Sequence, residues 1–325
     1  MKKPKILVVG SLVMDLIVSS ERIPASGETV IGFGFQTASG GKGANQAVQA
    51  ARLGADVTMV GKVGLDSFGT MLINTIKNSG VDVSHITVAE NTPSAIGNVL
   101  LEVKNGKTAN RIIVVPGANM KLTLDDISFI KDTVTDYDMV ILQLEIPMEI
   151  IETVAKYAFD NNVPVMLNSA PYVPISQRLY SYLTYISPNE HEAADITGIS
   201  VIDEKSINEA AKAILNNGVK NAIITLGSKG AVLCNDTEYI HSPCVPDVDV
   251  KDPTAAGDSF VGAFCTAVCI GVSHEKAMYF ANLAASITVS QMGAQPSLPD
   301  IDKVLELMKN RGIDTTEFII LRGIK

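Results

Sequence analysis

The chain has 325 residues, of which 46% are hydrophobic and 19% charged, and its formal net charge is −9 at pH 7. This length suits one large α/β domain or two smaller domains, and the high hydrophobic content excludes an intrinsically disordered chain. The acidic balance argues against a nucleic-acid-binding protein, because contacts to a phosphate backbone need clustered Lys and Arg. Small anions can still bind locally.

The sequence also argues against a His- or Cys-based metal site and against a membrane-spanning segment. The four histidines share no metal-ligand spacing, and the cysteines lack a paired CxxC, which predicts buried thiols at Cys234, Cys244, Cys265 and Cys269. The longest apolar run, Phe260 to Val272, is too short to span a bilayer and predicts a buried helix. Asp15 interrupts the first apolar segment, and no convincing signal-peptide cleavage site follows it. We expect a cytoplasmic protein that binds neither membrane nor nucleic acid.

The chain opens with the apolar run Ile6 to Val9, which is typical of a central parallel strand that is covered on both faces. Gly10 and Ser11 follow, and then a second run, Leu12 to Val18, that contains Asp15. This acid is either a functional group or a turn or cap residue. The next stretch, Glu28 to Ala38, is rich in aromatic and β-branched residues.

A glycine cluster, Gly40-Gly41-Lys42-Gly43-Ala44-Asn45, precedes apolar residues at helical spacing that end at Gly54. The cluster is therefore predicted at a helix N-terminus, where a small polar ligand can approach the backbone closely. It matches neither the GxxxxGK[ST] phosphate-binding loop nor the dinucleotide-binding GxGxxG. Both common nucleotide fingerprints are absent here.

A second strand-helix unit comes next, with a strand over Val57 to Val60 and a helix whose predicted apolar face is Phe68, Met71, Leu72, Thr75 and Ile76. Two β-rich stretches then flank Asn105-Gly106, a strong hairpin signal: Ile96 to Val103 and Asn110 to Val115. Together with Glu28 to Ala38, this hairpin could form a small separate sheet that moves as a lid.

Alternation of strands and helices returns over four segments: Met139 to Leu142, Pro164 to Asn168, Tyr185 to Ser187 and Ala222 to Leu226. Ligands of parallel α/β sheets bind beyond the carboxyl ends of the strands. Polar residues follow these predicted ends: Glu145, Asn168, Asn189, Glu192 and the segment Thr225 to Gly230. Each alone is compatible with a cap or a turn, but their joint placement predicts a binding site.

Asn189 and Glu192 lie three residues apart at a predicted helix start, so both can face one solvent-filled mouth. This arrangement suits an outer-sphere magnesium site, because Mg²⁺ keeps several waters and takes few protein ligands beside substrate phosphates. A helix-capping arrangement explains the same pair equally well.

The stretch Asp252-Pro-Thr-Ala-Ala-Gly-Asp258 opens onto the apolar run Val261 to Val272. A small-residue turn at a helix N-terminus directs free N–H groups and the positive end of the helix dipole to one place, which favours an anion. Asp258 adds a proton acceptor beside that place, and phosphoryl transfer to a hydroxyl needs both. The alternative is that Asp258 only caps a core helix.

These motifs occur in the order found in the ribokinase branch of the PfkB carbohydrate kinase family: Gly10-Ser11 with Asp15, Gly40 to Ala47, Pro116 to Asn119, Gln143 to Glu145, Pro188 to Glu192, Thr225 to Gly230 and Asp252 to Asp258. The chain resembles this family from residue 5 to about residue 305, and Gly293 to Ser297 strengthens the resemblance. The resemblance implies one ribokinase-like α/β domain over residues 1–325, with a central, mainly parallel sheet between helices. It also implies a small β-sheet lid from residues 12–39 and 94–118, through which two copies form a homodimer.

The family implies an ATP-dependent kinase that phosphorylates a pentose hydroxyl, first D-ribose to ribose 5-phosphate. A kinase for 2-deoxyribose, fructose or a nucleoside, or a sugar sensor without turnover, remains as an alternative. By resemblance, Asp258 is the catalytic base, assisted by the backbone N–H groups of Ala256, Gly257 and Asp258. The implied sugar-binding residues are Asp15, Gly41, Lys42, Asn45, Glu145 and Asp258.

The resemblance also implies ATP and cation sites. The implied ATP contacts are Asn189, Thr225, Gly227, Ser228, Gly230, Gly257 and Asn282. Mg²⁺ and its waters would be ordered by Asn189 and Glu192. A monovalent cation, usually K⁺, would bind near Asp252, Thr254, Gly293 and Ser297.

The chain departs from the family pattern at several positions. Val13 stands where an Asn usually precedes the first Asp by two residues, so one sugar hydroxyl loses a partner, which could favour a deoxy sugar or another substrate. Pro253 and Ala255 stand where Thr or Ile and Gly are common, and Ser169 replaces a usual Pro. The sequence assigns no role to the extension after about Asn310, in which Phe318 to Leu321 are apolar.

Overall fold

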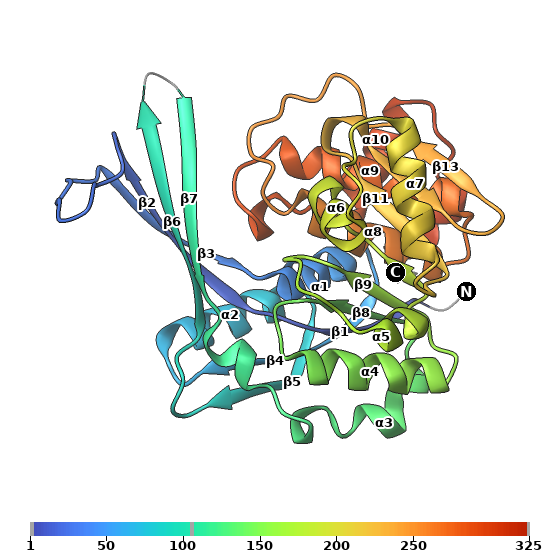
Figure 1. The fold of residues 1–325 in the computed structure, drawn as a ribbon, viewed down its shortest axis with the longest axis horizontal. Helices are drawn as coiled ribbons and strands as arrows, with labels where there is room; N and C mark the ends of the chain where they lie inside the picture. Colours follow the sequence, from blue (N-terminus) through green and yellow to red (C-terminus); the bar gives the residue numbers. More distant parts are fainter. Residues whose placement is uncertain (1–2, 105–106, 324–325) are drawn as a thin grey trace.

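The computed structural model describes residues 3–104 and 107–323, which form two sheets and the helices packed around the larger sheet (Figure 1). Within these residues the larger sheet has nine strands in the order β13-β12-β11-β10-β9-β8-β1-β4-β5. Its strands are β1 (Lys5–Val9), β4 (Asp56–Gly64), β5 (Asp82–Ala89), β8 (Met139–Gln143), β9 (Val165–Asn168), β10 (Tyr185–Ile186), β11 (Asn221–Thr225), β12 (Ala231–Cys234) and β13 (Tyr239–Ser242).

The larger sheet is parallel from β5 to β11 and antiparallel from β11 to β13. This confirms the predicted mainly parallel sheet between helices. The sequence pattern misses β5, β12 and β13. These strands lie at or near the two edges of the sheet, and β5 and β13 are only partly buried, so they lack the continuous apolar run of a central strand.

The helices provide the layers above and below this sheet. They are α1 (Lys42–Arg52), α2 (Ser67–Asn78), α3 (Ile130–Thr133), α4 (Met148–Asp160), α5 (Gln177–Tyr182), α6 (Glu190–Thr197), α7 (Glu204–Leu215), α8 (Ala256–Cys269), α9 (His274–Val289) and α10 (Ile301–Asn310). Short 3₁₀ helices are η1 (Gly117–Lys121), η2 (Asp125–Ile127), η3 (Val134–Asp136), η4 (Gly227–Lys229), η5 (Gln295–Ser297) and η6 (Thr316–Arg322). None of the helices within the described part of the chain is long and apolar enough to cross a membrane.

Two hydrophobic cores lie on opposite faces of the larger sheet. Ile6 and Val8 of β1 belong to the core that includes α1, α8, α9 and α10, whereas Leu7 and Val9 belong to the core that includes α4 and α7. Burial on both faces explains the uninterrupted apolar run in β1. Each fully buried aliphatic side chain of this kind stabilises the fold by about 1.5–3 kcal/mol.

The smaller sheet has the order β3-β2-β6-β7, and it extends away from the body of the molecule (Figure 1). Its strands are β2 (Val13–Ser20), β3 (Gly34–Gly40), β6 (Ala95–Lys104) and β7 (Lys107–Val115). The antiparallel pairing of β6 and β7 confirms the predicted hairpin, while its turn, Asn105-Gly106, lies outside the described residues. The predicted strand within Glu28 to Ala38 begins only at Gly34.

The segment after α10 packs against the main body, which gives the C-terminal extension a structural role. Phe318 and Leu321 in η6 are 3% and 1% exposed, and the Phe318 ring stacks on Phe280 of α9 with the centroids 4.6 Å apart. The backbone oxygen of Leu321 also lies 1.9 Å from where a Cβ of Gly54 would be. The glycine after α1 therefore makes room for this segment as well as ending the helix.

One predicted helix face needs correction. In α2, Leu72 and Ile76 are fully buried, but Met71 is 45% exposed. The buried stripe of α2 is therefore narrower than the sequence pattern predicts. The predicted buried cysteines hold for Cys234 and Cys265, whereas Cys244 and Cys269 are partly exposed.

Candidate active site

A cavity of about 480 Å³ opens at the carboxyl ends of the strands and at the N-terminus of α8. It collects many of the residues that sequence analysis selected from distant parts of the chain. Those that line it are Lys42, Asn168, Asn189, Glu192, Thr225, Gly227, Gly230, Ala256, Gly257, Asp258 and Asn282. Ser228 lines a neighbouring hollow instead, and its role in an ATP site stays a prediction.

Asp258 is the third residue of α8 and does not cap the helix. The N-cap is Ala255, and the Asp258 carboxylate instead accepts hydrogen bonds from two side chains of α1. Asn45 Nδ2 donates to Oδ2 and Gln46 Nε2 donates to Oδ1, each at 2.9 Å. Asp258 is 7% exposed and lines the cavity. This geometry excludes the capping interpretation and leaves a buried carboxylate at the cavity wall.

The first turn of α8 presents backbone N–H groups to the same cavity. Within the described residues, the N–H groups of Gly257 and Asp258 have no protein acceptor, and no atom lies within 4 Å of a Cβ built at Gly257. The N–H of Ala256 donates to the carbonyl of Pro253 at 3.2 Å in this structure, and its role in charge stabilisation stays a prediction. Two donors and the helix dipole remain for an anion.

The N-terminus of α1 holds Glu145. The carboxylate Oε2 accepts hydrogen bonds from the hydroxyl of Ser11 and, at 3.1 Å, from the backbone N–H of Lys42. Gly41, at φ +92°, precedes this turn, and a Cβ there would lie 2.8 Å from the Ser11 carbonyl. The glycine cluster therefore binds a protein carboxylate at its helix N-terminus, and Ser11 is a partner that the sequence analysis left without a role.

Asp15 lies in the middle of β2, so it is neither a turn nor a cap residue. Its carboxylate is inserted between two glycines on the flanking strands: a Cβ at Gly97 would lie 2.2 Å from Oδ1, and a Cβ at Gly40 would lie 2.9 Å from Oδ2. Burial, and secondarily the negative charge of Glu145, raise the pKa of Asp15 to about 6. Gly97 carries no sequence signal, because only the strand register places it beside Asp15.

The Lys42 ammonium group is close enough to three carboxylates for their charges to act on its pKa. Burial lowers the pKa of its ammonium group, but the carboxylates of Asp258, Glu145 and Glu192 outweigh that effect and raise the pKa overall. The group is therefore a cation at neutral pH, and it lies in the same cavity as the N-terminus of α8. Such a charge can stabilise an anionic ligand there.

Asn189 and Glu192 form a capping box at the start of α6, as the alternative interpretation predicts. The Glu192 carboxylate accepts from the backbone N–H and from Nδ2 of Asn189, both at 2.9 Å. Burial raises the pKa of Glu192 despite the hydrogen bond from the Asn189 backbone. The capping box does not remove Glu192 from the cavity, so an outer-sphere cation remains compatible with its position.

The predicted monovalent-cation residues lie together in two neighbouring loops. Asp252 accepts from the backbone N–H and the hydroxyl of Thr254, at 2.9 and 2.6 Å, and from the N–H of Gly293 at 2.9 Å. Burial opposes the ionised form of Asp252, but these hydrogen bonds lower its pKa. Ser297 donates to the Ala294 carbonyl at 2.7 Å. The Asp252 loop and the Gly293 loop are thus tied together next to α8.

The positions that depart from the family pattern have distinct environments. Val13 is 6% exposed and lies on the same face of β2 as Asp15, because strand side chains alternate. Ala255 has φ +61°, a conformation that costs a non-glycine residue about 1–2 kcal/mol, which explains why glycine suits this position. Ser169 is buried and its hydroxyl has no partner within the described residues.

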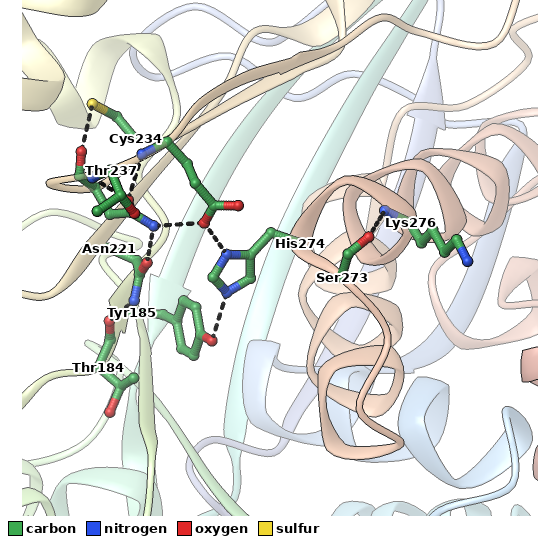
Figure 2. A network of polar contacts seen from close by, with 10 residues as sticks. Thr184, Tyr185, Asn221, Cys234, Thr237, Ser273, His274 and Lys276 are labelled. Atoms are coloured by element: carbon green, nitrogen blue, oxygen red, sulfur yellow. Dashed lines mark hydrogen bonds and ion pairs between the residues drawn. The ribbon is translucent and has the colours of Figure 1, made fainter.

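A second polar cluster lies away from the cavity (Figure 2). His274 Nδ1 lies 2.7 Å from Glu238 Oε2, and its Nε2 lies 3.1 Å from the hydroxyl of Tyr185. Asn235 Nδ2 also donates to Glu238 Oε2, at 2.9 Å. Burial raises the pKa of the Tyr185 hydroxyl. The cluster joins β10, the β12-β13 hairpin and the start of α9, so it packs these elements together.

Comparison with known proteins relates this geometry to a family. A sequence model of the pfkB family carbohydrate kinases matches residues 3–301. A ribokinase from Bacillus subtilis is 40% identical over 303 residues, which cover 93% of this chain and 99% of that protein. A deoxyribokinase from Salmonella typhi is 32% identical over 304 residues, 93% of this chain and 98% of that protein. The structure of Arabidopsis thaliana ribokinase complexed with ribose and ATP superimposes with a TM-score of 0.88 at 36% identity, over 95% of this chain and 99% of that one.

Proposed function

The chain belongs to the pfkB family of carbohydrate kinases, and we propose that it transfers the γ-phosphoryl group of ATP to a hydroxyl of D-ribose, giving ribose 5-phosphate and ADP. The observation that carries this proposal is the buried carboxylate of Asp258 beside the two free N–H groups at the start of α8. A proton acceptor and an anion site in one turn are what phosphoryl transfer to a hydroxyl requires.

In the proposed reaction, Asp258 accepts the proton of the attacking sugar hydroxyl. The hydroxyl oxygen forms a bond to the γ-phosphorus as the bond from that phosphorus to the β,γ-bridging oxygen breaks, and ADP leaves. The N–H groups of Gly257 and Asp258, with the Lys42 ammonium, stabilise the negative charge on the transferring group. Positioning and electrostatics supply most of the rate in such a step.

The sugar is proposed to lie between the smaller sheet and the N-terminus of α1, where Asp15, Gly41, Lys42, Asn45 and Glu145 surround it. Two carboxylates suit a polyhydroxylated ligand, because each accepts hydrogen bonds from neighbouring hydroxyls. The smaller sheet is proposed to act as a lid over this sugar. Its strand β2 carries Asp15, so a movement of the sheet would carry a sugar-binding carboxylate with it.

ATP is proposed to occupy the cavity beyond α8, with Asn189, Thr225, Gly227, Gly230 and Asn282 around it. Mg²⁺ bound to the ATP phosphates would neutralise charge on the transferring group, with Glu192 and Asn189 ordering its waters. A monovalent cation such as K⁺ would be held by the loops of Asp252, Thr254, Gly293 and Ser297. Those loops lie next to α8, so their order supports its N-terminal turn.

A homodimer through the smaller sheet is also proposed. Apolar side chains are exposed on this sheet and on the loop before β3: Ile31, Phe33, Phe35, Ile112, Ile113, Val114 and Val115. The edge strands β3 and β7 also have unpaired backbone groups that a second copy would cover. Sedimentation velocity tests this directly, and a monomer at micromolar concentration contradicts it.

A 2-deoxy sugar is the second candidate substrate, because the apolar Val13 lies on the sugar-facing side of β2 beside Asp15. ATP consumption is to be measured with ribose, 2-deoxyribose, fructose and a nucleoside, each with and without K⁺, with Asp258→Ala as the blank. Preference for ribose supports the proposal. Preference for another sugar keeps the kinase and makes Val13 the specificity determinant, while no turnover on the panel favours a sugar sensor.

A further inference from the structure

Gln46 is a buried polar residue that none of the roles proposed above uses. It follows Asn45 on α1, is 0% exposed, and its Nε2 donates to Asp258 Oδ1 at 2.9 Å. The same nitrogen lies 3.3 Å from Asn168 Oδ1 at the end of β9. Burying a polar group is costly unless it is hydrogen-bonded, and the donor of this fully buried amide is directed at the proposed base.

A hydrogen bond from Gln143 fixes the orientation of the Gln46 amide. Gln143 at the end of β8 is 0% exposed, and its Nε2 donates to Gln46 Oε1 at 2.7 Å. Gly10 leaves the room for this contact, since a Cβ there would lie 1.9 Å from Gln143 Oε1. Gln143 is part of β8 in the larger sheet and donates a hydrogen bond to Gln46, which in turn donates one to Asp258.

The Asp258 carboxylate determines the direction of these hydrogen bonds, because it can only accept from Gln46 when it is ionised. A reversed Gln46 amide would place its oxygen against Asp258 Oδ1 and against Asn168 Oδ1, so only the donor orientation is stable. Asn45 and Gln46 together occupy one acceptor site on each oxygen of Asp258, and an ionised carboxylate keeps about two of its four sites for a ligand in the cavity.

We propose that Gln46 is a positioning residue for phosphoryl transfer: supported by Gln143, it fixes the rotation of the Asp258 carboxylate and keeps it ready to accept the sugar proton. This inference rests on the proposed kinase activity. It assigns no contact between Gln46 and either substrate. Removing the amide donor therefore reduces turnover and leaves the binding of sugar and ATP nearly unchanged.

Gln49 provides a matched control on the next turn of α1. It is also 0% exposed and also joins α1 to α8, because its Oε1 accepts from the Ser259 hydroxyl at 2.9 Å. Its Nε2 donates to the Pro299 carbonyl at 3.0 Å. A loss of helix packing or of a buried hydrogen bond affects both positions, but only Gln46 contacts Asp258.

The test compares Gln46→Met and Gln49→Met with the wild-type chain in ATP and ribose turnover. For Gln46→Met we expect kcat to fall about 10–100-fold, the range that follows from a misplaced reacting group, while both KM values stay within about twofold. Gln49→Met is expected to lose comparable thermal stability and to keep the wild-type kcat.

The possible outcomes separate the positioning role from the proposed kinase activity. An active wild type with unchanged kcat in Gln46→Met overturns the positioning role and leaves the kinase intact. An inactive wild type overturns the proposed function itself. Equal kcat losses in the Gln46 and Gln49 variants indicate general packing and also overturn the inference. If Gln46→Met does not fold, Gln143→Met takes its place: it keeps the direct contacts to Asp258, and an unaltered kcat there contradicts the proposal.

Discussion

The cluster around Asp258 and the cluster around His274 (Figure 2) are built from similar parts, yet they differ in what they leave open. In each, one carboxylate accepts hydrogen bonds from amide side chains, and several chain segments meet. The second cluster even has the carboxylate, imidazole and hydroxyl order that hydrolases use to activate a nucleophile. By residue type alone, it is the better catalytic candidate.

The two clusters differ in whether their polar groups all have hydrogen-bond partners within the protein. Both ring nitrogens of His274 are engaged, and the Tyr185 hydroxyl is bonded in a residue that is 6% exposed. None of these groups lines the 480 Å³ cavity. At Asp258, by contrast, two backbone N–H groups and spare carboxylate lone pairs face that cavity. A satisfied network stabilises the fold, whereas an incompletely satisfied one next to a cavity can bind a ligand.

The greatest loss of kcat is expected for a substitution of Asp258, in the cluster that lines the cavity. Asp258→Asn keeps the shape of the side chain but removes the proton acceptor, so kcat should fall by about 10²–10⁴-fold. Circular dichroism should show a folded protein, and thermal unfolding should show some loss of stability, because the new amide nitrogen faces one of the amide donors of Asn45 and Gln46. Substantial activity in this variant would remove Asp258 from the role of general base.

Asp15 allows a test by pH. Its pKa is raised to about 6, so the carboxylate becomes protonated as the pH falls through 6 and accepts sugar hydroxyls less well. The value of kcat/KM for ribose should therefore decrease below about pH 6 and level off above pH 7. Asp15→Asn should raise the sugar KM about 10–100-fold at neutral pH, the usual value of a charged hydrogen bond, and should abolish this part of the pH dependence. A KM that does not respond to the substitution would place the sugar elsewhere.

Gly97→Ala tests the slot around Asp15 without changing a polar group. The new Cβ would lie 2.2 Å from Asp15 Oδ1, so the carboxylate must move. We expect the sugar KM to rise about tenfold, which corresponds to about 1.4 kcal/mol, with little change in kcat. Gly34→Ala in β3 is the control, because its Cβ would meet only Ser19, at 3.3 Å. Equal KM values in the two variants would count against the slot.

A substitution in the His274 cluster is expected to change kcat and KM least. His274→Phe removes the partner of the buried Tyr185 hydroxyl and one hydrogen bond to Glu238. Leaving such a group unsatisfied should lower the free energy of unfolding by about 1–3 kcal/mol. The kcat and KM of the folded variant should match the wild type when measured well below its melting temperature. A selective loss of kcat would show that this network does reach the active site.

Much of the site could be predicted because local sequence patterns encode it. The apolar run of β1, the glycine turn before α1 and the small residues before α8 each determine a backbone conformation within a few residues. The rule that ligands collect at the carboxyl ends of parallel strands then brings Asn189, Thr225 and Asp258 to one region. The cavity confirms that these three residues lie together.

Two details could not be read from the motifs. The Ala256 N–H is bonded to the Pro253 carbonyl, and Ser228 lines a neighbouring hollow, although both belong to motifs whose other residues line the cavity. A motif specifies a segment, but the rotation of one peptide or side chain within it depends on neighbours that the motif does not contain.

The fold class, the central strand-helix units and the two turns that open α1 and α8 follow from residues close together in the chain, so they can be predicted from sequence. The hydrogen bond from Gln46 to Asp258, 212 positions apart, and the fit of Gly97 against Asp15 appear only in the folded chain. Such contacts depend on helix separation and strand register to within an ångström. Local propensities do not determine distances of that kind, which are fixed only when the buried surfaces pack.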